Sequence, residues 1–104
     1  MRSEVLKGHV DLLLLATLRL GPLHGYGVVE RLRGASEEAF DLAEGTVYPA
    51  LYRLEGAGLL TSGWTTSGGR RRRVYRLTRR GREALARERK EWRAFARAIE
   101  AVLT

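Results

Sequence analysis

The side chains best suited to chemistry lie in one stretch, residues 44–55. Read as a helix, this stretch has two faces. Val47, Leu51 and Leu54 follow the spacing i, i+4 and i+7, which places them on one apolar stripe. The opposite face carries side chains that form hydrogen bonds, present flat surfaces or bear positive charge: Thr46, Tyr48, Pro49, Tyr52 and Arg53. Such side chains contact base edges, sugars and phosphates, so this face predicts nucleic-acid recognition; the alternative is a solvated face with incidental aromatic residues.

Four consecutive arginines form a second group: Arg70, Arg71, Arg72 and Arg73. Residues 62–80 contain seven arginines and no acidic residue, so their net charge of +7 equals that of the whole chain. The positive charge is therefore concentrated in one segment. A concentrated basic segment indicates a polyanionic partner. We expect phosphate or minor-groove contacts, but not from all four arginines at once, since alternate strand residues point to opposite faces. The alternative is a solvated loop, the usual place of charge runs.

Other chemistry is poorly supported by the sequence. The absence of cysteine excludes disulfides, thiolate zinc sites and cysteine nucleophiles. The histidines are His9 and His24, and a metal site would need carboxylates at spacings that the sequence does not offer. We expect His24 to be a turn residue that bonds to backbone, or a phosphate contact. No nucleophile and base stand together, so neither an enzyme, nor a metal, nor a cofactor is predicted.

The elements that would position these groups follow from periodicity and from chain breakers. Helices are expected at about 4–20, 25–35 and 45–56, with Thr46 as a candidate N-cap of the third. Residues 59–77 alternate around a turn at Gly68 and Gly69, which predicts a β-hairpin. This order is that of an α+β winged helix-turn-helix. We therefore predict a DNA-binding domain over residues 1–77 and a dimerisation helix over residues 78–104, packed on that domain.

A homodimer is expected from two apolar surfaces. The first helix is apolar on every side, and a chain of 104 residues can hardly cover all of them. The last helix carries Leu85, Trp92 and Ile99 at steps of seven, a heptad pattern broken at Glu88 and too short to form a coiled coil alone. Docked beside the first helix, it would complete a dimer interface. The predicted contacts are Leu12, Leu15, Leu85, Trp92, Phe95, Ile99 and Val102.

Length and composition favour one small globular domain, because 44% of the residues are hydrophobic and 104 residues leave no room for a second core. The longest apolar run, Leu12 to Leu18, is too short to span a bilayer, and the first residues lack the pattern of a secretory signal. We expect a cytoplasmic protein with no membrane partner.

The chain resembles the PadR family of bacterial transcriptional regulators. The segments that carry the resemblance are Pro22–Gly27, Glu44–Leu51, Leu54–Glu55 with Gly58–Leu59, Ser67–Arg72, and Tyr75–Thr78 with Gly81. They cover nearly the whole chain in order. The resemblance implies a dimeric winged helix, usually a repressor, that binds a pseudo-palindromic operator and dimerises through its C-terminal helix with support from the first helix. A single C-terminal helix is typical of the short-tailed members.

Some short-tailed relatives bind planar hydrophobic compounds between their subunits, beside a tryptophan of the last helix. Trp92 is the residue that corresponds to it here, although packing in the dimer core is the favoured interpretation of an aromatic residue at heptad spacing. The sequence thus predicts a homodimeric, sequence-specific DNA-binding repressor whose partners are double-stranded DNA and a second copy, with a small hydrophobic effector left open. The alternative function is a winged-helix module that docks proteins or binds RNA without a specific DNA site.

Overall fold

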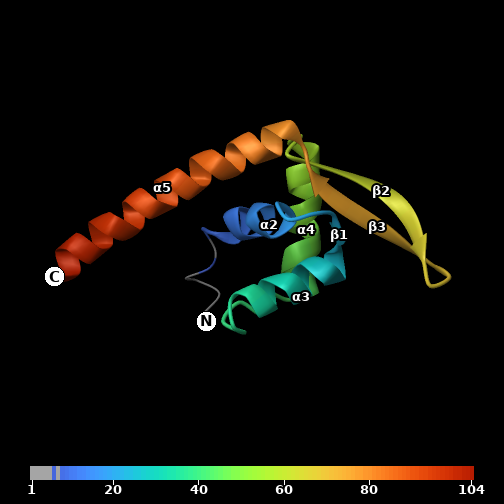
Figure 1. The fold of residues 1–104 in the computed structure, drawn as a ribbon, viewed down its shortest axis with the longest axis horizontal. Coiled ribbons are helices and arrows are strands. Elements are labelled where there is room, and N and C mark those ends of the chain that lie inside the picture. The colour runs from blue at the N-terminus through green and yellow to red at the C-terminus, as the bar shows by residue number, and fades with distance from the viewer. Residues whose placement is uncertain (1–5, 7) are drawn as a thin grey trace.

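The structure is a computed structural model that describes residue 6 and residues 8–104. Within these residues, the fold comprises four helices and a three-stranded antiparallel sheet, and a hairpin and a long helix project from the domain (Figure 1). The helices are α2 (Val10–Leu18), α3 (Gly25–Ala35), α4 (Glu44–Gly56) and α5 (Arg79–Leu103). The strands are β1 (Leu23–His24), β2 (Leu60–Ser67) and β3 (Arg70–Leu77). This arrangement confirms the predicted α+β winged helix.

The helix predicted over residues 4–20 is not continuous, because residues 8 and 9 form a turn. α2 begins at Val10, after a turn in which the His9 amide donates to the carbonyl of Leu6 over 2.8 Å, and it ends at Leu18 rather than at residue 20. The predicted start, at residues 4 and 5, lies outside the described residues. The apolar run continues to Leu20, but Gly21 has a φ of 147°, so the backbone leaves the helix there.

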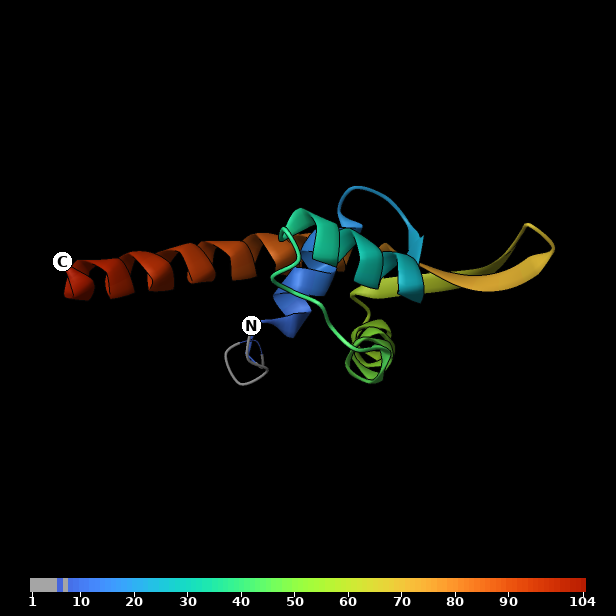
Figure 2. The same ribbon diagram turned by 90° about the horizontal axis from the view of Figure 1, so that it is seen from below.

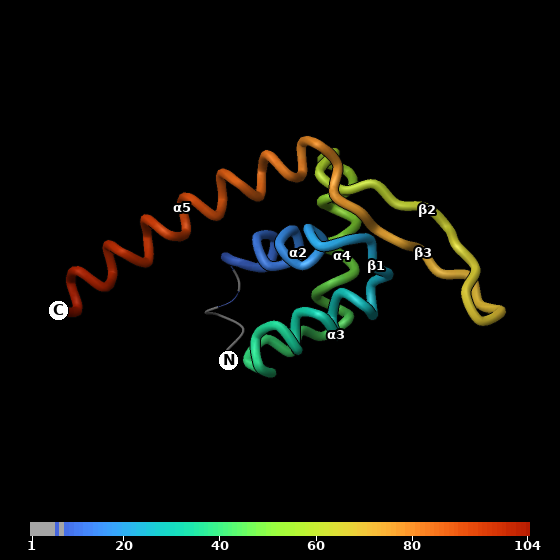
Figure 3. Tube along the Cα trace, in the orientation of Figure 1, coloured from blue at the N-terminus to red at the C-terminus, as the bar shows by residue number. Residues whose placement is uncertain are grey.

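α2 lies at the centre of the domain, where it packs against α3, α4, α5 and β3 (Figures 1 and 3). Leu14 and Leu15 are fully buried, and Leu18 is nearly so. This position explains why the helix is apolar on every side. It also shows that Leu15 was wrongly predicted as a dimer contact, because the subunit's own core covers it.

α4 begins at Glu44 and its N-cap is Ala43, in extended conformation, so the prediction of Thr46 as the N-cap was wrong. Pro49 consequently stands in the second turn of α4. Since proline has no N–H, α4 lacks the internal hydrogen bond that would reach the carbonyl of Gly45. The buried stripe is the one that the spacing predicts, with Val47 and Leu51 fully buried and Leu54 nearly so.

The sheet has the strand order β1-β3-β2. β2 and β3 form the wing, with Ser67 paired to Arg70 across a loop of two glycines. Gly68 and Gly69 have φ angles of 59° and 77°, as a two-residue type I′ turn requires at both positions. The third strand, β1, was not predicted, because two residues are too few to show alternation.

α5 starts against the core and then leaves it (Figure 2). Thr78 caps its first turn by accepting a hydrogen bond from the Gly81 amide over 3.0 Å. A Cβ at Gly81 would collide with the carbonyl of Leu59, so only glycine allows this approach. Ala84 and Leu85 are buried, which makes Leu85 part of the subunit core and corrects its prediction as a dimer contact. Among the described helices, none is long and apolar enough to cross a membrane.

Candidate nucleic-acid interface

The outward face of α4 keeps the side chains that the sequence assigns to it. On this face Tyr48 is half-buried, and the other four predicted residues are exposed: Thr46, Pro49, Tyr52 and Arg53. α4 stands at one side of the domain, and the wing extends beyond the core (Figure 2). The exposed face of α4 and the wing are therefore both accessible from outside the subunit.

The two tyrosines on this face differ in how they are held. The ring of Tyr48 lies so close to Gly25, the first residue of α3, that a Cβ there would collide with it. Tyr48 thus packs α4 onto the start of α3. The Tyr52 ring lies 6.5 Å from the Tyr48 ring, measured between centroids and inclined at 42°, and 58% of Tyr52 is exposed. Tyr52 is the tyrosine free to contact a partner.

Arg53 forms a two-pronged ion pair with Asp11, in the first turn of α2. Nη1 donates to Oδ2 and Nη2 to Oδ1, both over 2.8 Å. This geometry occupies the end of the guanidinium and leaves its other N–H groups open. The hydrogen bonds and the charge of Asp11 raise the pKa of Arg53. Asp11 was not singled out from the sequence, and no local pattern relates two residues that are 42 positions apart.

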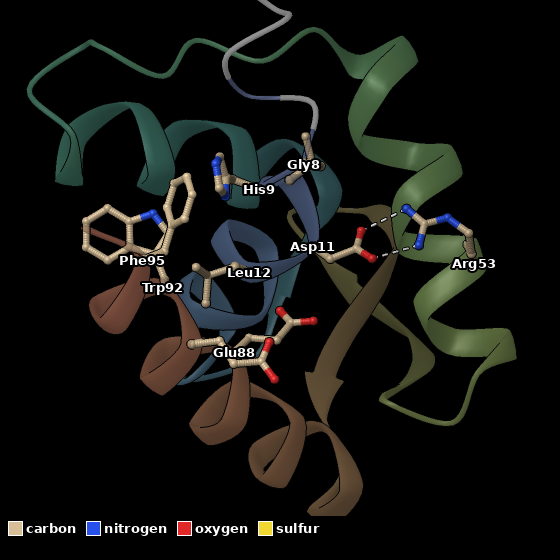
Figure 4. A pocket seen from close by; sticks show the side chains of 10 residues that line it. Gly8, His9, Asp11, Leu12, Arg53, Glu88, Trp92 and Phe95 are labelled. Carbon is tan, nitrogen blue, oxygen red and sulfur yellow. Dashed lines mark hydrogen bonds and ion pairs between the residues drawn. The ribbon is translucent and has the colours of Figure 1, made fainter. Parts of the chain in front are cut away.

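This ion pair borders a pocket of about 420 Å³ between α2, α4 and α5 (Figure 4). Trp92 and Phe95 of α5 line the pocket across from Arg53. Glu88 and Glu91 of the same helix also line it. Burial, and then the nearby charges of Asp11 and Glu91, raise the pKa of Glu88. Trp92, the candidate effector contact, and Arg53, the candidate DNA contact, therefore line the same pocket.

The wing separates its arginines onto two faces, as the alternation of strand residues requires. On one face, the guanidinium carbons of Arg71 and Arg73 lie 4.7 Å and 5.7 Å from the centre of a Trp64 ring. Trp64 stands directly across from Arg73 in the strand register, and 58% of it is exposed. Trp64 was not identified from the sequence; its position opposite an arginine run was the signal that could have found it.

The same face of the wing is joined to α4. Arg73 Nε donates to the hydroxyl of Ser62 over 2.9 Å, and that hydroxyl donates to Glu55 near the end of α4 over 2.6 Å. Arg73 Nη2 also lies 3.6 Å from Glu55 Oε1. These contacts fix the position of the wing relative to α4, and sequence reasoning missed Glu55 and Ser62 in this role.

On the opposite face, Arg72 contacts His24, the N-cap of α3. Arg72 Nη1 lies 2.9 Å from His24 Nε2, while His24 Nδ1 accepts from the Gly27 amide over 3.0 Å. A neutral imidazole has one acceptor nitrogen, so both contacts cannot be full hydrogen bonds at once. Burial, and then the charge of Arg72, lower the pKa of His24. The predicted bond from His24 to backbone is present, and Arg70 is exposed beside the turn.

The far half of α5 carries large apolar side chains that its own chain leaves uncovered. Trp92 and Phe95 are 45% and 56% exposed, and Ile99 and Val102 are 43% and 86% exposed. Leu12 of α2 is half-buried and borders the same pocket as Trp92. Five of the seven predicted dimer contacts thus retain accessible surface.

Comparison with known proteins identifies the family to which this chain belongs. Residues 14–87 match the Transcriptional regulator PadR-like family. The chain belongs to the PadR-like family. Its members are transcriptional regulators and not enzymes. A relative in Mycobacterium tuberculosis, the transcriptional regulator Rv3488, is 40% identical over 77 residues, which cover 74% of this chain and 69% of the relative.

Solved structures of PadR-like and related regulators share the fold. A transcriptional regulator from Clostridium thermocellum is 30% identical, with a TM-score of 0.87 over 96% of this chain and 95% of that chain. The Bacillus subtilis PadR in complex with operator DNA is 25% identical, with a TM-score of 0.68 over 75% of this chain and 45% of that chain.

Proposed function

We propose that this PadR-family protein is a homodimer that binds a pseudo-palindromic operator and represses transcription. The observation that carries the proposal is the pairing of an exposed polar and aromatic face on α4 with an arginine-bearing wing fixed to the same helix. The solved PadR bound to operator DNA, which aligns with three quarters of this chain, supports the assignment of DNA as the partner.

In this proposal α4 enters the major groove, where Tyr52 and Arg53 reach bases or the sugar–phosphate backbone. Thr46, Tyr48 and Pro49 lie on the same side of the helix and border that contact. The wing places Arg70, Arg71, Arg72 and Arg73 beside the flanking phosphates or in the minor groove. Phosphate contacts provide affinity and orientation, whereas contacts of α4 with bases provide specificity.

The second subunit is proposed to cover the apolar residues of α5. A contiguous apolar surface on a projecting helix indicates an interaction site. Trp92 and Phe95 lie beside Leu12 at the pocket, and Ile99 and Val102 continue the surface along α5. A two-fold dimer would present two copies of α4 to half-sites separated by about one turn of DNA.

A planar hydrophobic effector is proposed to bind beside Trp92 and to modulate DNA binding. The pocket supports this role because it is lined by Trp92 and Phe95 on one side and by the Asp11–Arg53 pair on the other. Saturable quenching of fluorescence by planar compounds, measured in Trp64→Phe so that Trp92 is the one tryptophan left, would support the effector site. Unchanged fluorescence across a panel of such compounds would leave Trp92 as dimer packing.

The proposed function is tested by selecting binding sites from random DNA duplexes and measuring the mass of the protein in solution. We expect an inverted repeat and a dimer. A double substitution, Phe95→Glu with Ile99→Glu, should yield monomers and weaken operator binding about 100-fold or more, because the linked second half-site is lost. Arg97→Glu is the matched control on the opposite side of α5. A folded wild-type dimer without a preferred sequence would favour the protein-docking or RNA-binding alternative.

A further inference from the structure

We propose that Trp64 is a positioning residue for DNA binding, whose indole holds the guanidinium groups of Arg71 and Arg73 in place for phosphate contacts. The inference rests on the proposed function, because it assigns a role within the same interface. Trp64 lies outside the segments that carry the family resemblance and outside the predicted site residues.

The contact geometry is that of a cation–π cluster. Both guanidinium carbons lie within about 6 Å of the Trp64 ring, the range in which a cation is attracted to an aromatic face. Trp64 of β2 pairs with Arg73 of β3 in the register, and Arg71 lies two residues before Arg73 on β3. All three side chains therefore project from one face of the wing.

A cation–π contact orients an arginine without using its hydrogen bonds. The indole lies against the guanidinium, whereas the five N–H donors radiate in the guanidinium plane. Within residue 6 and residues 8–104, Arg71 forms no ion pair, so its charge is not compensated there. Arg71 is thus held in position while its charge and donors remain available to a phosphate.

The cluster is also fixed relative to α4. Arg73 is bonded to Ser62 and lies beside Glu55, which connects the face that carries Trp64 to the end of α4. Trp64 itself is 58% exposed, so its ring stays accessible beside the two guanidinium groups. The arginines beside Trp64 are thus carried at a fixed position relative to the end of α4.

Affinity for a mixed-sequence DNA duplex, measured over a range of salt concentrations, tests this role. Trp64→Ala should weaken binding about three- to tenfold, because the arginines must then be ordered on binding. The slope of log K against log salt should change little, since the same phosphates are still neutralised. Trp64→Phe, which keeps an aromatic face, should restore most of the affinity, and Thr65→Ala on the other face of β2 is the matched control.

The decisive measurement is a double-mutant cycle. If Trp64 acts through the arginines, Trp64→Ala should have almost no effect in a protein that already carries Arg71→Ala and Arg73→Ala. An undiminished effect in that background would show that Trp64 contacts DNA directly and would overturn the proposal. So would a lowered melting temperature with unchanged affinity, which would identify Trp64 as a purely structural residue.

A wild-type protein that binds no duplex refutes the proposed function itself, whereas wild-type binding with an inert Trp64→Ala refutes this inference alone.

Discussion

Arg53 on α4 and Arg71 on the wing are both exposed guanidinium groups on the proposed DNA surface, but their partners differ in charge. Arg53 is held by the carboxylate of Asp11 through two hydrogen bonds of 2.8 Å. Arg71 is held by the ring of Trp64 at 4.7 Å. The carboxylate orients its arginine by neutralising it, whereas the indole orients its arginine and leaves the charge in place.

This difference predicts different roles at the same surface. A phosphate can attract Arg71 on any DNA sequence, because no ion pair has to be broken first. Arg53 must exchange its two bonds with Asp11 for bonds of similar geometry before the end of its guanidinium can contact DNA. The O6 and N7 acceptors of guanine offer such a pair of bonds. Arg53 is therefore suited to selective contacts and Arg71 to general affinity.

The largest expected effect comes from Arg53→Ala at the selected operator. If Arg53 reads a guanine, the loss should be about 1–3 kcal/mol, with relaxed specificity at that base. Binding to a mixed-sequence duplex should change little, since the charge of Arg53 is already compensated by Asp11. Arg71→Ala is the comparison: it should weaken binding to both duplexes and flatten the salt slope by about one. Equal losses from Arg53→Ala on both duplexes would contradict the base-reading role.

A smaller effect of opposite sign is expected from Asp11→Asn. Removing the carboxylate frees the guanidinium of Arg53 for phosphates, so affinity for a mixed-sequence duplex should rise a few-fold and the salt slope should steepen by up to about one. Glu91→Gln removes a neighbouring negative charge from the same pocket without releasing Arg53 and is the matched control. Weaker binding by Asp11→Asn would show instead that Asp11 orients Arg53 for DNA.

The smallest effect concerns the third type of arginine partner, the imidazole of His24. Its pKa lies below the ordinary value of 6.5, so the folded state favours the neutral ring. The resulting stability is complete above pH 6.5 and is lost as pH falls through the lowered pKa. The free energy of unfolding, measured in urea between about pH 7.5 and about pH 5.5, should therefore fall more in the wild type than in His24→Asn. His9→Asn is the control, and an equal pH dependence of the wild type and His24→Asn would exclude His24 as the cause.

Local patterns predicted the elements and the buried stripe of α4, because helical spacing and a glycine turn are properties of neighbouring residues. Partners distant in sequence escaped prediction. No periodicity relates Asp11 to Arg53, because only the folded chain brings them together. Leu15 and Leu85 were assigned to the wrong interface for a related reason: an apolar helix face shows that something must cover it, but not which neighbour does.

The cap of α4 illustrates a further limit. Thr46 has the side chain of a good N-cap, but the helix starts where the backbone changes conformation, at Ala43, whose side chain forms no cap. The short strand β1 was missed because its pairing with β3 depends on the position of β3, not on its own two residues. The exposed face of a regular helix was therefore easier to predict than the residues that hold others in place.

The close contact between Gly81 and the carbonyl of Leu59 gives α5 a fixed point at its base. Trp92 lies eleven residues further along a continuous helix, or about 16 Å at 1.5 Å per residue. A tilt of α5 by about 10° around that point would move Trp92 by about 3 Å, close to the rise of one base-pair step. In the proposed dimer, such a change of angle would alter the spacing of the two α4 helices by an amount comparable to one base-pair step of the operator.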